Sequence, residues 1–100
     1  MSKTCYSDYV KHALRFYSRN CDEKPAFRSE VDKSNWHSCD SVLSHYPLDA
    51  RKLLIEVYSG RDTLPDEVYG ASKKWKVDQN WIWDEMKKLE RKIAKRRGLI

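Results

Sequence analysis

The sequence predicts an all-α protein, a compact bundle of about five helices that ends in a helix-turn-helix with a long basic C-terminal helix. Apolar residues recur at spacings of three and four, which is the period of an amphipathic helix and not of a strand. The 100 residues include only three glycines and three prolines, fewer than a β-sandwich or barrel with frequent turns would need. A chain of this length is expected to form a single helical domain over residues 1–100.

Two helices are expected in the N-terminal part of this domain, residues 1–46. The first covers residues 7–19, with Ser7 as its N-cap. Residues 20–28 have no apolar period and are expected to form a loop. The second helix opens at Ser29 and is interrupted by Pro47. Its predicted apolar face consists of Val31, Trp36, Cys39, Val42, Leu43 and Tyr46.

Three further helices are expected in residues 47–100. Pro47 suits the first turn of the third helix, which ends at Gly60. The fourth helix starts at Thr63, followed by a proline and two acids, and Asp78 is expected to cap the fifth. The fifth helix continues to Arg97. The predicted buried stripes are Leu48, Leu53, Leu54, Val57 and Tyr58 in the third helix, and Ile82, Met86, Leu89, Ile93 and Leu99 along the fifth.

The positive charge of the chain is concentrated near its C-terminus. The formal net charge is +5, but residues 73–97 contain ten basic and four acidic side chains, so the remainder is nearly neutral. Such an asymmetry indicates a surface that faces a polyanion. The alternative is an ordinary solvated helix end, with lysines near the negative pole of the helix dipole.

The sequence also bears on location. No stretch approaches the ~20 apolar residues of a membrane span, and residues 1–5 lack the apolar run of a signal peptide. Cys5, Cys21 and Cys39 are odd in number and scattered, which favours reduced thiols. We therefore expect a cytoplasmic protein that does not contact membranes.

The last two predicted helices have the spacing of a helix-turn-helix. Ala71 lies where the helices would cross, Val77 would enter the core from the turn, and Ile82 would pack back from the second helix. Lys76 stands where glycine would ease the turn, and Glu85 stands where another apolar residue is usual. Amides pair with adenine edges, and lysines contact guanine or phosphate. The residues expected to face the bases of the major groove are Gln79, Asn80, Trp83 and Lys87.

Several short motifs in residues 42–100 can be read together. They are Val42-Leu43, Leu48-Asp49-Ala50-Arg51, Leu54, Val57-Tyr58, the helix-turn-helix, and the final Ile93-Ala94-Lys95-Arg96-Arg97-Gly98-Leu99-Ile100. Together they resemble the sigma region 4-like domains of small phage transcription regulators, which occur in Gram-positive phages and integrated elements as late-gene activators. The resemblance implies that residues 47–100 bind DNA, with the helix at about 79–97 in the major groove. It assigns no role to residues 1–41.

The expected function is that of a non-enzymatic transcription regulator, of phage or mobile-element type, that binds double-stranded DNA without a cofactor. The alternative is a small phage-type interaction or inhibitor protein that binds RNA polymerase or another host protein instead of DNA. Trp81 and Trp83 lie on different sides of one helix, so one of them is available to a partner. The residues expected to bind phosphates are Lys73, Lys74, Lys76, Lys88, Arg91, Lys95, Arg96 and Arg97.

Other chemistries find little support in the sequence. Cys39 and His45 lack the strand and turn that present a catalytic nucleophile, and the glycines are too far apart for a phosphate-binding loop. A zinc site would require the fold to bring together His12, Cys21, His37 and Cys39, because their spacing is not that of a zinc motif. No catalytic residue and no metal ligand is therefore assigned.

Overall fold

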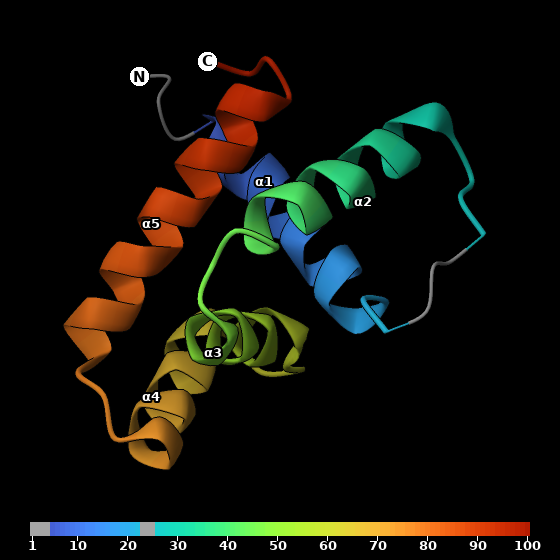
Figure 1. Ribbon diagram of the computed structural model, residues 1–100. Coiled ribbons are helices and arrows are strands. Elements are labelled where there is room, and N and C mark those ends of the chain that lie inside the picture. The colour runs from blue at the N-terminus through green and yellow to red at the C-terminus, as the bar shows by residue number, and fades with distance from the viewer. Residues whose placement is uncertain (1–4, 23–25) are drawn as a thin grey trace.

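The computed structural model describes residues 5–22 and 26–100, and this part of the chain consists of five α-helices and their connections (Figure 1). They are α1 (Cys5–Arg19), α2 (Glu30–Leu43), α3 (Leu48–Ser59), α4 (Leu64–Trp75) and α5 (Gln79–Arg96). The predicted all-α class and the number of helices are confirmed. The expectations about residues 1–4 and the Cys5 thiol lie outside the described residues.

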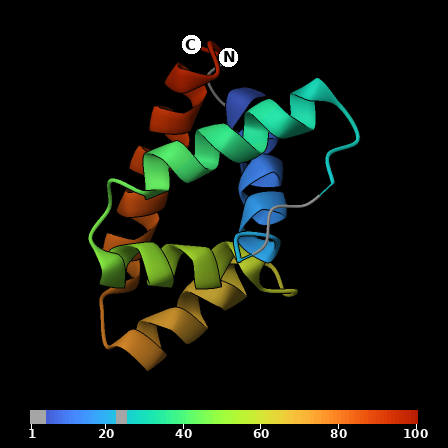
Figure 2. The same ribbon diagram turned by 45° about the vertical axis from the view of Figure 1, so that its right-hand side comes forward.

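All five helices share one core. α1 packs against α2, α3 and α5, whereas α4 packs against α3 and α5. In Figures 1 and 2, α5 runs along one side of the molecule, with α3 and α4 at its start and α1 and α2 towards its end. The N-terminal helices are therefore built into the same core that carries α5.

The core is formed largely by the predicted apolar faces. In α3 and α5 the buried residues include Leu53, Leu54, Val57 and Tyr58, and Ile82, Met86, Leu89 and Ile93, as predicted. Three predicted core positions are wrong, because Val31 is 51% exposed, Leu48 63% and Leu99 39%. Each lies near the start of its helix or beyond its end, where no neighbouring helix covers it. Helical periodicity indicates which side is buried but not how far the covering helix extends.

Of the two predicted helix caps, Asp78 is confirmed and Ser7 is wrong, and Ser29, where the second helix was expected to open, also caps its helix. The Ser29 hydroxyl accepts a hydrogen bond from the Asp32 backbone N–H at 3.2 Å, and the Asp78 side chain accepts from the Asn80 N–H at 2.8 Å. Ser7 is not a cap, since α1 begins at Cys5. Its hydroxyl instead donates to Glu90 of α5 at 2.9 Å, a partner that local sequence does not reveal.

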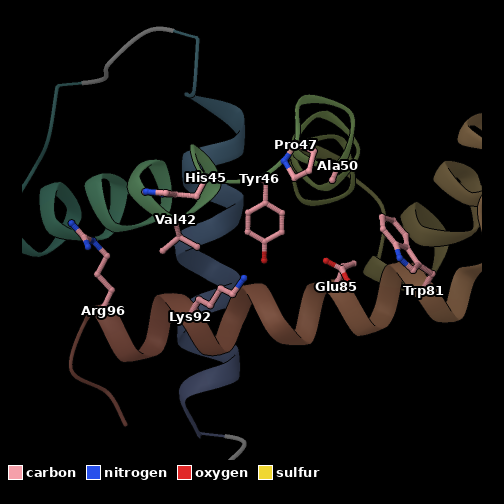
Figure 3. Close-up of a pocket in the computed structure, with 9 residues that line it drawn as sticks. All are labelled: Val42, His45, Tyr46, Pro47, Ala50, Trp81, Glu85, Lys92 and Arg96. Carbon is pink, nitrogen blue, oxygen red and sulfur yellow. The ribbon is translucent and has the colours of Figure 1, made fainter.

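The connection between α2 and α3 lies against α5. The Tyr46 ring points from this connection towards α5, where the Lys92 ammonium lies 4.8 Å from the ring centroid (Figure 3). This distance is that of a cation–π contact. Burial raises the pKa of the Tyr46 phenol. The contact fixes the connection close to the middle of α5.

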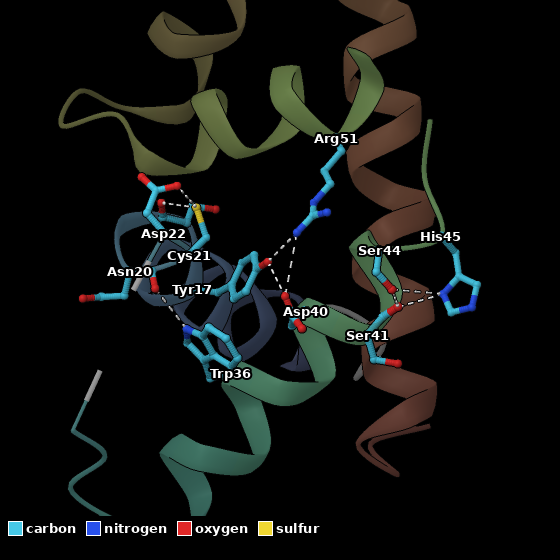
Figure 4. A network of polar contacts seen from close by, with 11 residues as sticks. Tyr17, Asn20, Cys21, Asp22, Trp36, Asp40, Ser41, Ser44, His45 and Arg51 are labelled. Atoms are coloured by element: carbon cyan, nitrogen blue, oxygen red, sulfur yellow. Dashed lines mark hydrogen bonds and ion pairs between the residues drawn. The ribbon is translucent and has the colours of Figure 1, made fainter. Parts of the chain in front are cut away.

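A second polar cluster joins α1, α2 and α3. The Tyr17 hydroxyl donates to Asp40 at 2.8 Å and accepts from Arg51 at 3.3 Å (Figure 4). The Tyr17 ring is fully buried and meets the edge of Trp36 at a centroid separation of 5.2 Å. Burial, reinforced by the hydrogen bond to Asp40, raises the pKa of Tyr17 to about 12.

The most deeply buried ionisable cluster joins α1, α3 and α5 through Glu90, which is only 5% exposed. One carboxylate oxygen accepts hydrogen bonds from Ser7 at 2.9 Å and from the Lys11 ammonium at 3.0 Å. The other accepts from the Tyr58 hydroxyl at 2.6 Å. Three donors from two other helices thus compensate the lost hydration of a buried carboxylate.

We expect Glu90→Ala to destabilise the protein by about 3 kcal/mol, because it leaves the buried Tyr58 hydroxyl and the Lys11 ammonium without their partner. The control is Lys74→Ala, which removes an exposed ion pair with Glu56 and should cost less than about 1 kcal/mol. Urea denaturation of both variants measures the difference. Equal losses in the two variants would contradict the importance of the buried cluster.

The Tyr58 phenol makes stability sensitive to alkaline pH. Burial and the adjacent Glu90 carboxylate raise the pKa of Tyr58 well above its ordinary value of 10. Above about pH 10, the tyrosine of the unfolded chain releases its proton, whereas Tyr58 in the folded protein keeps it. Unfolding therefore becomes more favourable by up to about 1.4 kcal/mol per pH unit for this group.

Tyr58→Phe should remove this contribution, so its free energy of unfolding should fall less steeply with pH above about 10 than that of the wild type. Urea titrations at a series of alkaline pH values test this, with Tyr69→Phe, which replaces an exposed phenol, as the control. Parallel pH dependences for Tyr58→Phe and the wild type would refute the assignment.

Candidate nucleic-acid interface

The connection between α4 and α5 is three residues long and is closed by local hydrogen bonds. The Val77 backbone N–H donates to the Ser72 carbonyl at 3.1 Å, and the Ser72 hydroxyl donates back to the Val77 carbonyl at 2.5 Å. Ala71 and Ile82 are buried and Val77 packs partly against the core, as their predicted roles require. The two helices are therefore held at a fixed crossing by a short, rigid turn.

Lys76 has left-handed backbone angles, with φ 56° and ψ 48°. This conformation follows from its place as the C-cap of α4, where the chain must reverse within three residues. A side chain with a Cβ atom is disfavoured here and glycine is not. The sequence-based suspicion that this turn suits glycine is therefore correct.

The outer face of α5 is defined here as Asn80, Asp84, Lys87, Lys88, Arg91 and Lys95, all of which are exposed. Asn80, Lys87 and Arg91 are spaced by seven and four residues, so they lie one above the other along the helix. The opposite side of α5 carries the buried Ile82, Met86, Leu89 and Ile93. The outer face has four basic residues against one acidic residue. It is not covered by any part of the chain that the structure describes.

The predicted base-facing residues are only partly brought together. Asn80 and Lys87 share the outer face, whereas Gln79 is exposed in the first turn, about 100° around the helix from Asn80. Trp83 is half-buried and packs against the core. The more exposed tryptophan is Trp81, at 41%, and it lies to the other side of the outer face.

The predicted phosphate-binding residues fall into separate groups. Lys88, Arg91 and Lys95 lie on the outer face, with Lys88 3.5 Å from Glu85. The lysines at the end of α4 and in the turn are exposed, but Lys74 forms an ion pair with Glu56 at 2.8 Å and Lys73 lies 5.0 Å from the Tyr69 ring centroid. The exposed lysines at the end of α4 and in the turn are Lys73, Lys74 and Lys76.

The two C-terminal arginines of this set point elsewhere. The Arg97 guanidinium is half-buried and donates to the Asn35 side chain at 2.7 Å and to the Tyr9 hydroxyl at 3.5 Å. The hydrogen bonds that the Tyr9 hydroxyl accepts from Arg97 and from the Asn35 amide lower the pKa of Tyr9. Arg96 lies near the end of α2 and lines a groove beside α5 (Figure 3). Arg97 thus joins the end of α5 to α1 and α2, a contact that charge counting did not reveal.

The described residues give little support to a metal site or to a cysteine nucleophile. Within residues 5–22 and 26–100, no three His, Cys, Asp or Glu side chains gather as metal ligands. Cys21 and Cys39 are unpaired, and burial raises the pKa of the Cys39 thiol to about 12, which disfavours a nucleophilic thiolate. Among the described helices, none combines the length and apolar character required to cross a bilayer.

Comparisons of the chain with protein-family models, with curated proteins and with solved structures found no match. The geometry of the site is therefore the basis for assigning a function.

Replacing the left-handed Lys76 by glycine should relieve backbone strain in the turn. Lys76→Gly is expected to be more stable than Lys76→Ala by about 1 kcal/mol, because both remove the charge but only glycine relieves the backbone strain. Urea denaturation of the pair measures this. Greater stability of the alanine variant would be incompatible with a left-handed residue at the turn.

Proposed function

We propose that this protein is a non-enzymatic regulator that binds double-stranded DNA by placing α5 in the major groove. The observation that carries the proposal is the outer face of α5, with four basic residues on a helix that follows α4 after a tight three-residue turn. This arrangement fits the plan of a helix-turn-helix, in which the second helix reads DNA. The major groove is about 12 Å wide and accepts a helix of about 10–12 Å diameter.

In this proposal the residues of the outer face have different roles. Asn80 and Lys87 face base edges, with Gln79 at the entering end of the helix, because amides and ammonium groups suit adenine and guanine. Asp84 would be repelled by a phosphate and fits better beside a cytosine amino group. Lys88, Arg91 and Lys95 contact phosphates. Trp83 is half-buried against the core, so less of its ring is available for a base contact.

The regulatory part of the proposal rests on the sequence. The motifs of residues 42–100 resemble sigma region 4-like domains of phage and mobile-element regulators, and such a protein would act on transcription. Arg97 and Lys74 contribute little to DNA binding in this view, because their charges already serve contacts within the fold. The phosphate-binding set thus reduces chiefly to the cations of the outer face.

We predict binding to random-sequence duplex DNA that weakens with salt. If Lys88, Arg91 and Lys95 neutralise about three phosphates, log affinity should fall against log salt with a slope near −2.7. Removing these three charges in Lys88→Ala/Arg91→Ala/Lys95→Ala should abolish most of this slope. Fluorescence anisotropy of a labelled duplex measures both quantities.

The control variant is Arg28→Ala/Lys52→Ala/Arg61→Ala, which has the same net charge but loses exposed cations away from α5. It should keep most of the wild-type slope. Absence of duplex binding by the wild type at low salt would reject the proposed function. Equal effects of the two triple variants would reject α5 as the binding element.

A further inference from the structure

A groove of about 610 Å³ runs along α5, beside the outer face. Its opposite wall is formed by the end of α2, the connection to α3 and the start of α3 (Figure 3). Trp81 stands at one end, and the apolar side chains of Val42, Tyr46, Pro47 and Ala50 line the wall facing α5. The groove therefore offers an apolar, partly aromatic surface that is open to solvent.

The two ends of the groove differ in charge. Lys92 and Arg96 lie towards the C-terminal end of α5, near His45, whereas Trp81 lies near the N-terminal end and Glu85 between them (Figure 3). The Tyr46 ring holds the Lys92 ammonium by a cation–π contact at 4.8 Å. His45 Nδ1 lies 2.8 Å from the Ser41 carbonyl oxygen, to which it donates (Figure 4). Within the cationic end, the Lys92 and His45 side chains are thus each held by a contact within the fold.

The length of the groove suits an extended segment of a partner. Trp81 and Arg96 are fifteen residues apart on α5, a distance of about 22 Å along the axis. An extended segment of about seven residues would span the groove.

We propose that this groove binds an extended segment of a partner protein that carries an apolar side chain against Trp81 and a carboxylate side chain five or six residues away against Lys92 and Arg96. The two cations complement the carboxylate, and Glu85 disfavours an acid at the apolar end, so the segment has one preferred direction. A partly exposed tryptophan in an apolar recess is a frequent centre of binding energy in protein interfaces. Since these residues lie outside the outer face of α5, the segment and DNA would bind to different surfaces.

The test is selection from a displayed library of random seven-residue peptides against the full chain. We expect enriched peptides to combine an aromatic or aliphatic residue with Asp or Glu at a separation of five or six positions. Affinity of a selected peptide should fall at least tenfold in Trp81→Ala and in Lys92→Ala/Arg96→Ala. The control Lys87→Ala/Arg91→Ala, on the outer face, should bind the peptide like the wild type. Circular dichroism and thermal unfolding show that each variant is folded.

Charge reversal provides a second, positive test. Lys92→Glu/Arg96→Glu should lose the acidic peptide and bind a version in which its acids are replaced by lysine. The proposal is overturned if no acidic-apolar peptide is enriched, or if the enriched peptides bind the groove variants as tightly as the wild type. It is also overturned if Trp81→Ala abolishes a dimer detected by sedimentation, or lowers duplex binding as much as the outer-face variant does. In those cases the groove belongs to a second copy of the chain or to the DNA surface.

Discussion

The buried carboxylate of Glu90 is the constraint on which the arrangement of this fold depends. A carboxylate removed from water is costly unless donors replace its hydration, and here the donors come from Ser7 and Lys11 in α1 and from Tyr58 in α3. The three helices must therefore meet at one place and in one orientation. Apolar packing alone would tolerate small rotations of α5, but the carboxylate needs all three donors within hydrogen-bonding distance.

Because the inner side of α5 is held in the core, only the residues on its other side are exposed to solvent. Apolar side chains and Glu90 occupy the inner side, Arg97 joins the last turn to α2, and Lys92 lies against Tyr46. The basic character of residues 73–97 is thus divided between contacts that hold the fold and an exposed remainder. The proposed DNA surface is this remainder, which is smaller than the total charge indicates. The adjacent groove, with cations at one end and tryptophan at the other, is a surface of different chemistry.

Local patterns in the sequence were sufficient for the helices and for several of their ends. The period of apolar residues identified α1 to α5, and the side chains of Ser29 and Asp78 identified two helix starts, because these signals depend on neighbours within a few residues. The spacing of the helix-turn-helix also indicated that the turn at Lys76 suits glycine. The structure gives Lys76 the left-handed conformation that glycine adopts without strain.

What could not be predicted depends on residues distant in the sequence. Nothing near Glu90 indicates that it is buried, because its partners are 32 to 83 positions away in the chain. The same holds for Arg97, whose partner Asn35 lies in α2, and for the groove, whose walls come from separate helices. Periodicity also placed Leu48 and Leu99 in the core, because it cannot show where a covering helix ends. The candidate site was therefore predicted as a set of charges, and the structure shows which of those charges share a surface.

The most direct measurement of the central claim is a nuclear magnetic resonance titration of the ¹⁵N-labelled protein with a short random-sequence duplex. If the outer face of α5 enters the major groove, the largest changes in backbone amide chemical shift should occur at Asn80, Lys87, Arg91 and Lys95. The changes in α1 and α2 should be smaller. Absence of shift changes at low salt, or changes centred on α1 and α2, would contradict the account.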